Sequence, residues 1–435
     1  MQSFGRRIPT RGWEKRAVAS WRRTRFRRGQ CLDVEAATQP PPTRRNRITN
    51  PPYLDQVVEL LKSEDPDLWA WFSSPKLQQE QAEKVRLDLL KSTYRLNPVD
   101  EPEVYALAQR ALEMLELDVP ITLYQVQQHD GLNASLAFLP DEAHIVLHGN
   151  LRETLTDEEL QSVLGHELGH LLLWEMEDRR YLYTDQLLSA LSWDEGQSEP
   201  YQRTARLYAL YTEVFCDRAA ILVAQDLEIV VSALVKINTG SANIQVQSYL
   251  QQAEEVLSRS EEVTDGYTHP ETYLRAHALQ VWFNNDPQAE QKIAERIEGP
   301  IVFTELDLFG QRKMQSTTRN LVQHILQPDW IRTEAVLGHA RLFFDDVNEL
   351  LQVPALPPVE PFQDKRTREY LCYVLLDFVA ADRDLDPAAL AHAIQLANQW
   401  NLTGPFKEIA VRELRMRKKQ FDLVAEGDEV KNEMP

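Results

Sequence analysis

The order of hydrophobic and polar positions predicts a chain built mainly of helices. Apolar residues recur every three or four positions in YLDQVVELLKSEDPDLWAWF (53–72) and in LQQEQAEKVRLDLLKS (77–92), a period typical of amphipathic helices. The same period runs through EPEVYALAQRALEMLEL (101–117). We therefore expect residues 51–100 to form a small helical lead-in ahead of a larger domain.

A short stretch with a period of two interrupts this helical pattern. VPITLYQVQQ (119–128) alternates as a strand does, and NASLAFLPDEAHIVLHGN (133–150) predicts a hairpin with its turn at Pro140 and Asp141. These segments predict a small β-sheet. If AHIVLH, the second strand of the hairpin, lies at the edge of that sheet, it can align an extended peptide by β-augmentation.

The next predicted helix begins with a capping box. Thr156 can accept a hydrogen bond from the first turn, and Glu159, three residues later, can return one. The stretch VLGHELGHLLL (163–173) is then the body of this capped helix. Further helices are predicted at 201–225 and 240–258.

Helical spacing places two histidines one turn apart on the same face. His166 and His170 stand at i and i+4 in an H-E-x-x-H pattern, so both imidazole rings can reach one zinc ion. Glu167 would lie beside the metal, where a carboxylate can take a proton from zinc-activated water. His144 and His148 would lie about 13 Å apart along the predicted strand, too far to share a metal, and we expect them at the surface or lining the cleft.

A catalytic zinc ion needs a third protein ligand, and the predicted helix RLYALYTEVFCDRAAILVA (206–224) offers one. Glu213 and Asp217 also stand at i and i+4, on a helix side otherwise filled by Leu and Ala, where carboxylates are costly to desolvate unless a cation meets them. We expect Glu213 to be the third ligand and Asp217 to hold a ligand histidine in its metal-binding tautomer. The alternative is a salt bridge to Arg206 or Arg218 on an exposed face.

HELGH, followed further along the chain by EVFCDRAA, resembles the gluzincin metallopeptidases of the HtpX, Oma and CAAX-prenyl-endopeptidase family. Their pattern is H-E-x-x-H and then E-x-x-x-D. NASLAF, HIVLHGNL, TDEELQSVLGHELGH and THPETYLRAHAL resemble other segments of that family in the same order. The resemblance covers residues 101–285 and implies a zinc metallopeptidase domain that holds one zinc ion.

The resemblance also implies a role for individual residues. His166, His170 and Glu213 resemble the zinc ligands, Glu167 the general base, and Asp217 the acid behind a ligand histidine.

His269 and Arg275 resemble residues on the substrate side of that site, where a histidine can stabilise an oxyanion. The implied fold class is α+β and predominantly helical: a gluzincin, zincin-type catalytic domain with a small β-sheet, plus a C-terminal helical domain. Members of the HtpX type carry transmembrane helices, but this sequence has no apolar run of about 18 residues. We therefore expect a cytoplasmic protein similar to the soluble members.

These features predict a zinc-dependent endopeptidase that acts on protein or peptide substrates. The absence of a G-x-M-E-N exopeptidase signature favours cleavage inside chains. A catalytically silent zinc-binding scaffold is the main alternative, and the presence of Glu167 argues against it because a structural site needs no base. An iron oxidoreductase with two histidines and one carboxylate is disfavoured by the E-x-x-x-D arrangement and the lack of a cofactor loop.

Charge and cysteine content limit the partners and the compartment. The net charge is −20, but residues 1–50 carry thirteen Lys and Arg against three acids, so the rest of the chain carries −30. We expect no specific nucleic-acid partner, because so acidic a body repels phosphate. The basic segment is predicted to be a disordered arm, with a transit peptide, a phosphate- or partner-binding arm and an over-extended gene start as alternatives.

Three cysteines without a C-x-x-C pair predict neither disulfides nor a thiolate zinc site, and Cys216 is expected in the core.

Two Pro-rich stretches, at 39–52 and 354–361, mark linkers. Residues 286–360 form an irregular connecting region, which we expect to occlude the cleft because an unregulated protease would be harmful. Residues 361–425 resemble the TerB-like helical module of tellurite resistance, which implies a role in protein interaction or metal sensing; a plain helical cap is the alternative. Calcium is not expected at DRDLDP (382–387), where Pro replaces the Gly that an EF-hand loop requires.

Overall fold

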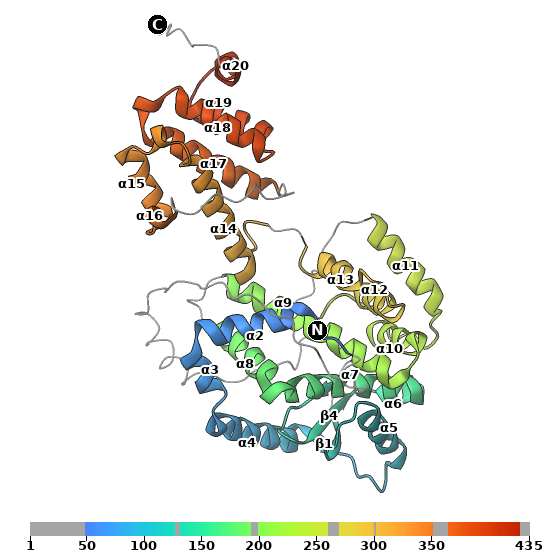
Figure 1. Cartoon of the computed structure of the whole chain (residues 1–435). Helices are drawn as coiled ribbons and strands as arrows, with labels where there is room; N and C mark the ends of the chain where they lie inside the picture. The colour runs from blue at the N-terminus through green and yellow to red at the C-terminus, as the bar shows by residue number, and fades with distance from the viewer. Residues whose placement is uncertain are drawn as a thin grey trace. The chain divides into compact units, whose positions relative to one another are not determined.

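The computed structural model describes residues 48–126, 131–192, 199–259, 269–299, 302–350 and 364–426 (Figure 1). The chain divides into two compact units, of which unit 1 ends at Gly299 and unit 2 begins at Pro300. Unit 1 combines a small sheet with many helices, and the described residues of unit 2 are helical. The predicted α+β, predominantly helical fold is confirmed.

Among the described residues, unit 1 holds a four-stranded mixed sheet in the order β1-β2-β4-β3. β2 and β4 run parallel, whereas β1 pairs with β2 and β3 pairs with β4 in antiparallel fashion. The predicted hairpin and the strand before it are confirmed, and β1 was not predicted. The strands are β1 (Thr93–Arg95), β2 (Ile121–Val126), β3 (Asn133–Leu136) and β4 (Ala143–His148).

The condition under which AHIVLH could align a peptide, a place at the edge of the sheet, is not met. This strand, β4, lies between β2 and β3, and all six of its residues are buried. With a parallel neighbour on one side and its hairpin partner on the other, β4 has no free row of backbone groups. The edge on this side is β3, which contacts the helix α7 (Asp157–Glu175).

The two histidines of β4 were expected at the surface or lining the cleft, and a place at the surface is wrong. His144 and His148 are buried, with exposed fractions of 6% and 5%. His144 contacts the Tyr124 hydroxyl through Nδ1 (3.1 Å) and Glu142 Oε2 through Nε2 (2.8 Å), while His148 Nε2 lies 3.0 Å from the Ser135 hydroxyl. A buried histidine is tolerated in a sheet when such partners replace water.

Two helices carry the catalytic pattern and pack against each other. α7 begins with the predicted capping box, in which Thr156 and Glu159 exchange hydrogen bonds. Glu159 also accepts a hydrogen bond from Lys236 Nζ (2.8 Å) in α10 (Leu227–Thr239), which ties the start of α7 to its neighbour. α9 (Glu199–Ala224) lies along α7 and supplies the second half of the pattern.

The segment expected as a lead-in is an integral part of unit 1. α2 (Pro52–Glu64) packs on α8 (Arg180–Ser192) and on α9, and Tyr53 stacks on Tyr211 with 5.1 Å between ring centroids. α4 (Pro75–Ser92) packs Leu89 against the sheet and leads directly into β1. The remaining helices of unit 1 are α3 (Pro66–Phe72), α5 (Pro102–Met114), α6 (Leu151–Thr154), η2 (Glu177–Arg179), α11 (Val246–Arg259), α12 (Thr272–Phe283) and α13 (Ala289–Ile297).

Unit 2 is a helical bundle with its own hydrophobic core. Leu321 and Val336, from the region expected to connect the domains, share this core with Leu375, Ile394 and Phe406. No helix in the described part of the chain is both long and apolar enough to cross a membrane. The helices of unit 2 are α14 (Leu308–Ile325), η3 (Asp329–Ile331), α15 (Glu334–Phe343), α16 (Val347–Leu350), α17 (Lys365–Ala381), η4 (Arg383–Leu385), α18 (Ala388–Gln399), α19 (Thr403–Glu413) and α20 (Lys418–Glu426).

Candidate metal centre

Two glycines let α7 and α9 approach closely. A Cβ atom on Gly169 would lie 2.9 Å from the Cα atom of Cys216 and 2.9 Å from the Cβ atom of Ala219. A Cβ atom on Gly165 would lie 2.8 Å from the Cβ atom of Val223. Backbone and Cβ atoms cannot move aside as a flexible side chain can, so these glycines set the distance between the two helices.

We expect Gly169→Ala to lower the free energy of unfolding by about 1–3 kcal/mol, because the added methyl group overpacks the contact with α9. If the site binds zinc, the same change should weaken binding, since the candidate donor on α9 would shift away from those on α7. Thermal unfolding and zinc affinity would be measured together. Gly338→Ala in α15 is the control, because its Cβ meets nothing within 4 Å; an equal loss in both variants would contradict the packing argument.

This close approach brings His166, His170 and Glu213 together. His166 Nε2 lies 3.4 Å from Glu213 Oε2, and His170 Nε2 lies 3.5 Å from Glu213 Oε1. Each side chain is mostly buried, with exposed fractions of 13%, 13% and 7%. Ligand atoms around a tetrahedral zinc ion lie about 3.3 Å apart, since each metal bond is about 2.0–2.1 Å long. Glu213 thus lies at about this distance from each of the two histidines, through a different oxygen in each case.

Glu213 carries a buried oxygen that supports the same conclusion. Among the described residues, its Oε2 atom has no hydrogen-bond partner. Burial alone would raise the pKa of Glu213, but His269, His166 and His170 beside it hold that pKa well below its ordinary value. A buried carboxylate that stays ionised with an unsatisfied oxygen is suited to a cation.

Cys216 offers a competing donor on the same helix. Its Sγ atom and a ring nitrogen of each of His166 and His170 all lie within 4.8 Å of one another. The side chain is fully buried, and burial together with the nearby carboxylates raises the pKa of the thiol well above its ordinary value. Glu213, by contrast, presents one oxygen to each histidine, and its pKa is held well below its ordinary value.

Asp217 and Arg275 lie behind His166. His166 Nδ1 contacts Asp217 Oδ1 at 3.0 Å, which leaves Nε2 directed at Glu213. Arg275 donates from Nε to Asp217 Oδ2 (2.8 Å) and from Nη2 to Oδ1 (2.5 Å). Burial would raise the pKa of Asp217, but Arg275 and His166 lower it. Burial also disfavours a charged imidazole, yet the carboxylates of Asp217 and Glu213 raise the pKa of His166 to about 10.

Glu167 is buried next to this cluster, with an exposed fraction of 7%. Burial raises the pKa of its carboxyl group to about 7, against the opposing effect of His166. The backbone of Leu136, in the edge strand β3, also lies beside this carboxyl group. A carboxyl group with a pKa near neutrality is suited to accept a proton and release it again.

The residues that the sequence placed on the substrate side have different environments. His269 is exposed over 56% of its side chain, and its Nε2 atom lies 3.5 Å from Glu213 Oε2. Arg275 is exposed over only 13% of its side chain, because its guanidinium group lies on Asp217. His269 therefore faces the open side of the cluster, whereas Arg275 supports it from within.

An aromatic row beside His170 was not predicted. The His170 ring lies 5.4 Å from Trp174, and Trp174 lies 5.5 Å from Phe138, which follows β3. Trp174 stands at i+4 from His170, so helical spacing alone could have found it. The contact with Phe138 depends on how the hairpin packs against α7.

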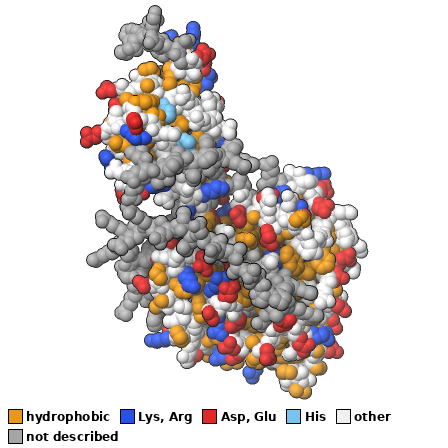
Figure 2. All heavy atoms as spheres, in the orientation of Figure 1, with side chains coloured by type: hydrophobic (Ala, Val, Ile, Leu, Met, Phe, Trp, Pro, Cys, Tyr) orange, Lys and Arg blue, Asp and Glu red, His pale blue; other side chains and the backbone are white. Residues whose placement is uncertain are grey.

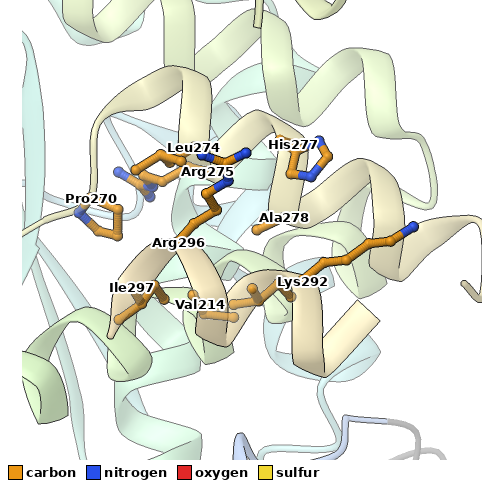
Figure 3. Close-up of a pocket in the computed structure, with 10 residues that line it drawn as sticks. Val214, Pro270, Leu274, Arg275, His277, Ala278, Lys292, Arg296 and Ile297 are labelled. Atoms are coloured by element: carbon orange, nitrogen blue, oxygen red, sulfur yellow. The ribbon is translucent and has the colours of Figure 1, made fainter. Parts of the chain in front are cut away.

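A pocket adjoins the site and shares Arg275 with it. Figure 3 shows this pocket between α9, α12 and α13, with the basic side chains of Arg275, Lys292 and Arg296 around it. Lys292 contacts Asp286 at 2.6 Å, and Arg296 donates a 2.9 Å hydrogen bond to the carbonyl oxygen of Leu257. None of the residues that line the pocket is acidic, so it is not a second place for a cation.

Comparison with known proteins identifies the segment that carries this cluster. Residues 98–283 match the sequence profile of peptidase family M48, and this range includes all seven residues of the predicted site. Residues 98–283 are a peptidase family M48 domain. A curated relative of the M48 domain is "Plastoglobule-localized metallopeptidase 48, chloroplastic" of Arabidopsis thaliana, which is 33% identical over 199 residues. The alignment covers 41% of this chain and 56% of that protein, so the chain matches only about half the length of the relative.

The M48 match confirms the metallopeptidase resemblance of residues 101–285. The structural unit around the M48 domain is larger than the matched range, because α2, α4 and β1 precede it and α13 follows it. The TerB-like resemblance of residues 361–425 stays a prediction.

Proposed function

We propose that the chain is a zinc-dependent endopeptidase that hydrolyses peptide bonds in protein substrates. The observation that carries this proposal is the meeting of His166 Nε2 and His170 Nε2 with the two oxygens of Glu213, at 3.4 and 3.5 Å. These three residues would hold the zinc ion. When bound there, zinc would acidify a water molecule and polarise the peptide carbonyl group.

The side chains around the metal would each have a separate role in the reaction. Glu167 would accept the proton of the attacking water and later give it to the leaving amine, since burial places its pKa at about 7. Asp217 would hold His166 with Nε2 free, and Arg275 would hold Asp217 in turn. His269, on the exposed side of Glu213, would donate a hydrogen bond to the developing oxyanion.

The edge strand β3 is the best place for an extended substrate. β3 is short and lies at the edge of the sheet beside α7, and the backbone of Leu136 lies next to Glu167. A peptide that paired with β3 would therefore pass directly in front of the proposed base. This mode recognises the backbone and fits an enzyme that cleaves inside chains.

Metal removal tests the proposal most directly. Dialysis of the full chain against a strong chelator should abolish hydrolysis of an unfolded casein substrate, and one equivalent of zinc should restore it. Metal content would be measured by elemental analysis in parallel. Hydrolysis that persists without metal, or zinc that binds without any cleavage under all conditions, would argue for another function; the second result is expected of a silent scaffold.

We expect zinc affinity to depend steeply on pH. The pKa of His166 is raised to about 10 in the metal-free protein, so below that pH the metal must displace a proton from this ring. The apparent affinity should therefore fall as the pH falls, by about tenfold per unit for each proton released. Competition with a coloured chelator at several pH values measures this slope. In Asp217→Asn, which lacks one of the two carboxylates that raise the pKa of His166, the slope near neutral pH should flatten.

The cellular location has two alternatives. The sequence suggests the cytoplasm, whereas the name of the Arabidopsis relative places that protein in chloroplasts. The Arg-rich segment 1–50 fits a transit peptide as well as a disordered arm. Fluorescent fusions of the full chain and of a chain without this segment would distinguish the alternatives.

Two further expectations stay predictions. They are a protein partner for residues 361–425 and occlusion of the cleft by residues 286–360.

A further inference from the structure

The most exposed hydrophobic side chains gather on one short segment of unit 1. In the described part of the chain, five large hydrophobic residues are at least half exposed, and four of them lie within 13 consecutive positions. They are Leu87 (50%), Leu90 (64%), Tyr94 (61%) and Val99 (83%). The fifth, Leu342, lies in unit 2. Soluble proteins seldom expose large hydrophobic patches, so this clustering makes the segment a candidate interaction site.

Basic side chains alternate with these hydrophobic ones. Residues 84–95 carry four cations against one acid, Asp88, which makes +3 in a chain whose net charge is −20. Figure 2 shows hydrophobic, basic and acidic side chains intermingled at the lower end of unit 1, where Figure 1 places α4 and β1. Arg86 also contacts Glu142, so it is partly neutralised. The exposed cations are Lys84, Arg86, Lys91 and Arg95. We refer to the exposed part of residues 84–99 as the α4–β1 surface.

Contacts with the sheet hold the α4–β1 surface in place. Leu89 is 7% exposed and packs with Tyr124 and Val146 of the sheet, which turns the opposite side of α4 outward. β1 is fixed by antiparallel pairing with β2. The surface therefore needs no refolding in order to bind, which removes one cost of association.

Charge decides which partner this surface fits. A second copy of the chain in a two-fold dimer would place each α4–β1 surface against its own equivalent, so that two surfaces of net positive charge would meet. An anionic lipid surface instead meets the cations with opposite charge and accepts the leucine side chains between them. Tyr94 is suited to the same boundary, because its ring is apolar and its hydroxyl group is polar.

We propose that the α4–β1 surface docks the protein on a membrane or lipid-particle surface that contains anionic lipids. The leucines enter the headgroup layer, and the cations contact the lipid phosphates. Docking is peripheral and reversible, and it is separate from the proposed peptidase chemistry, because none of the residues that form this surface belongs to the metal site.

Vesicle flotation of the full-length chain tests the docking. Vesicles of phosphatidylcholine with about 30 mol% phosphatidylglycerol are compared with pure phosphatidylcholine, because the charge contribution requires anionic lipid. We expect Leu87→Asp/Leu90→Asp to lower the affinity for anionic vesicles at least tenfold. Lys84→Glu/Lys91→Glu should lower it similarly, since each cation contributes about fivefold. Leu342→Asp and Lys418→Glu/Lys419→Glu, which make the same changes on exposed residues of unit 2, should bind like the wild type.

A site-specific probe separates this surface from the basic segment 1–50, which can also attract anionic lipid. An environment-sensitive fluorophore is attached at Leu90→Cys in a Cys31→Ser background; Cys216 and Cys372 are fully buried and stay unlabelled. Its emission should shift to shorter wavelength on anionic vesicles, and a label at Leu342→Cys should not respond.

Three results would overturn the proposal. In the first, the protein floats but the label at position 90 does not respond, which assigns binding to another segment. In the second, Leu87→Asp/Leu90→Asp floats as well as the wild type. In the third, the label at position 90 shifts without vesicles as the protein concentration rises, which assigns the surface to contact with a second copy. Peptide cleavage is not measured in any arm, so failure of the peptidase proposal would leave these results unchanged.

Discussion

Replacing Glu167 by Gln is expected to lower kcat/KM for a protein substrate by about 10²–10⁴-fold while zinc content stays unchanged. Gln has nearly the same shape as Glu but cannot accept a proton at neutral pH. Glu167 is buried beside His166 and Glu213 but is not one of the three donors that meet each other, so its loss should not release the metal. Cleavage of casein and elemental analysis on the same samples measure both effects.

The control for this prediction lies on the same helix. Glu175 is at the end of α7, where it pairs with Arg179 at 2.9 Å and not with the metal site. Glu175→Gln should keep both zinc and activity. If Glu167→Gln lost zinc in proportion to activity, Glu167 would be a ligand; if it kept full activity, the proton acceptor would have to be another group.

Replacing Glu213 by Gln is expected to weaken zinc binding by more than about 100-fold and to abolish cleavage as a consequence. Loss of a residue that only supports a ligand typically costs about 10–100-fold in metal affinity, and loss of the ligand itself should exceed that range. The reason is the position of Glu213, whose two oxygens each meet one histidine. Zinc titration against a competing chelator measures the change.

Three variants calibrate this result. Asp217→Asn removes the group behind His166 and should fall within the smaller, 10–100-fold range. Glu290→Gln makes the same chemical change at a partly exposed residue that pairs with Arg218, and should bind zinc normally. Cys216→Ser tests the competing donor. If zinc remained bound in Glu213→Gln but was lost in Cys216→Ser, the third ligand would be the Cys216 thiol and not Glu213.

Much of the candidate site follows from helical spacing alone. His166 and His170 stand one turn apart on α7, and Glu213 and Asp217 stand one turn apart on α9, so each pair shares a face whatever the rest of the chain does. The cost of burying two carboxylates on an apolar helix side then indicates that something cationic must meet them. Both inferences use contacts within a single helix, and local geometry makes such contacts predictable.

Most of the errors and omissions concern contacts between different elements of the chain. Nothing within AHIVLH tells an edge strand from an inner one. The place of β4 inside the sheet depends on parallel pairing with β2, across a connection that no local pattern encodes. β1 has three residues, too few for a recognisable period. His144 is buried because Tyr124 and Glu142 reach it from other parts of the hairpin and sheet.

By itself, the sequence determined the predominantly helical fold class, the capped helix α7, the hairpin and the two helical pairs of candidate site residues, because these depend on periods and caps within about 20 residues. Only the tertiary structure decided that Gly165 and Gly169 bring those pairs together, that Arg275 holds Asp217, and that β3 is the edge beside Glu167. It also decided that residues 84–99 present their hydrophobic and basic side chains outward, since burial depends on which other elements pack against a helix.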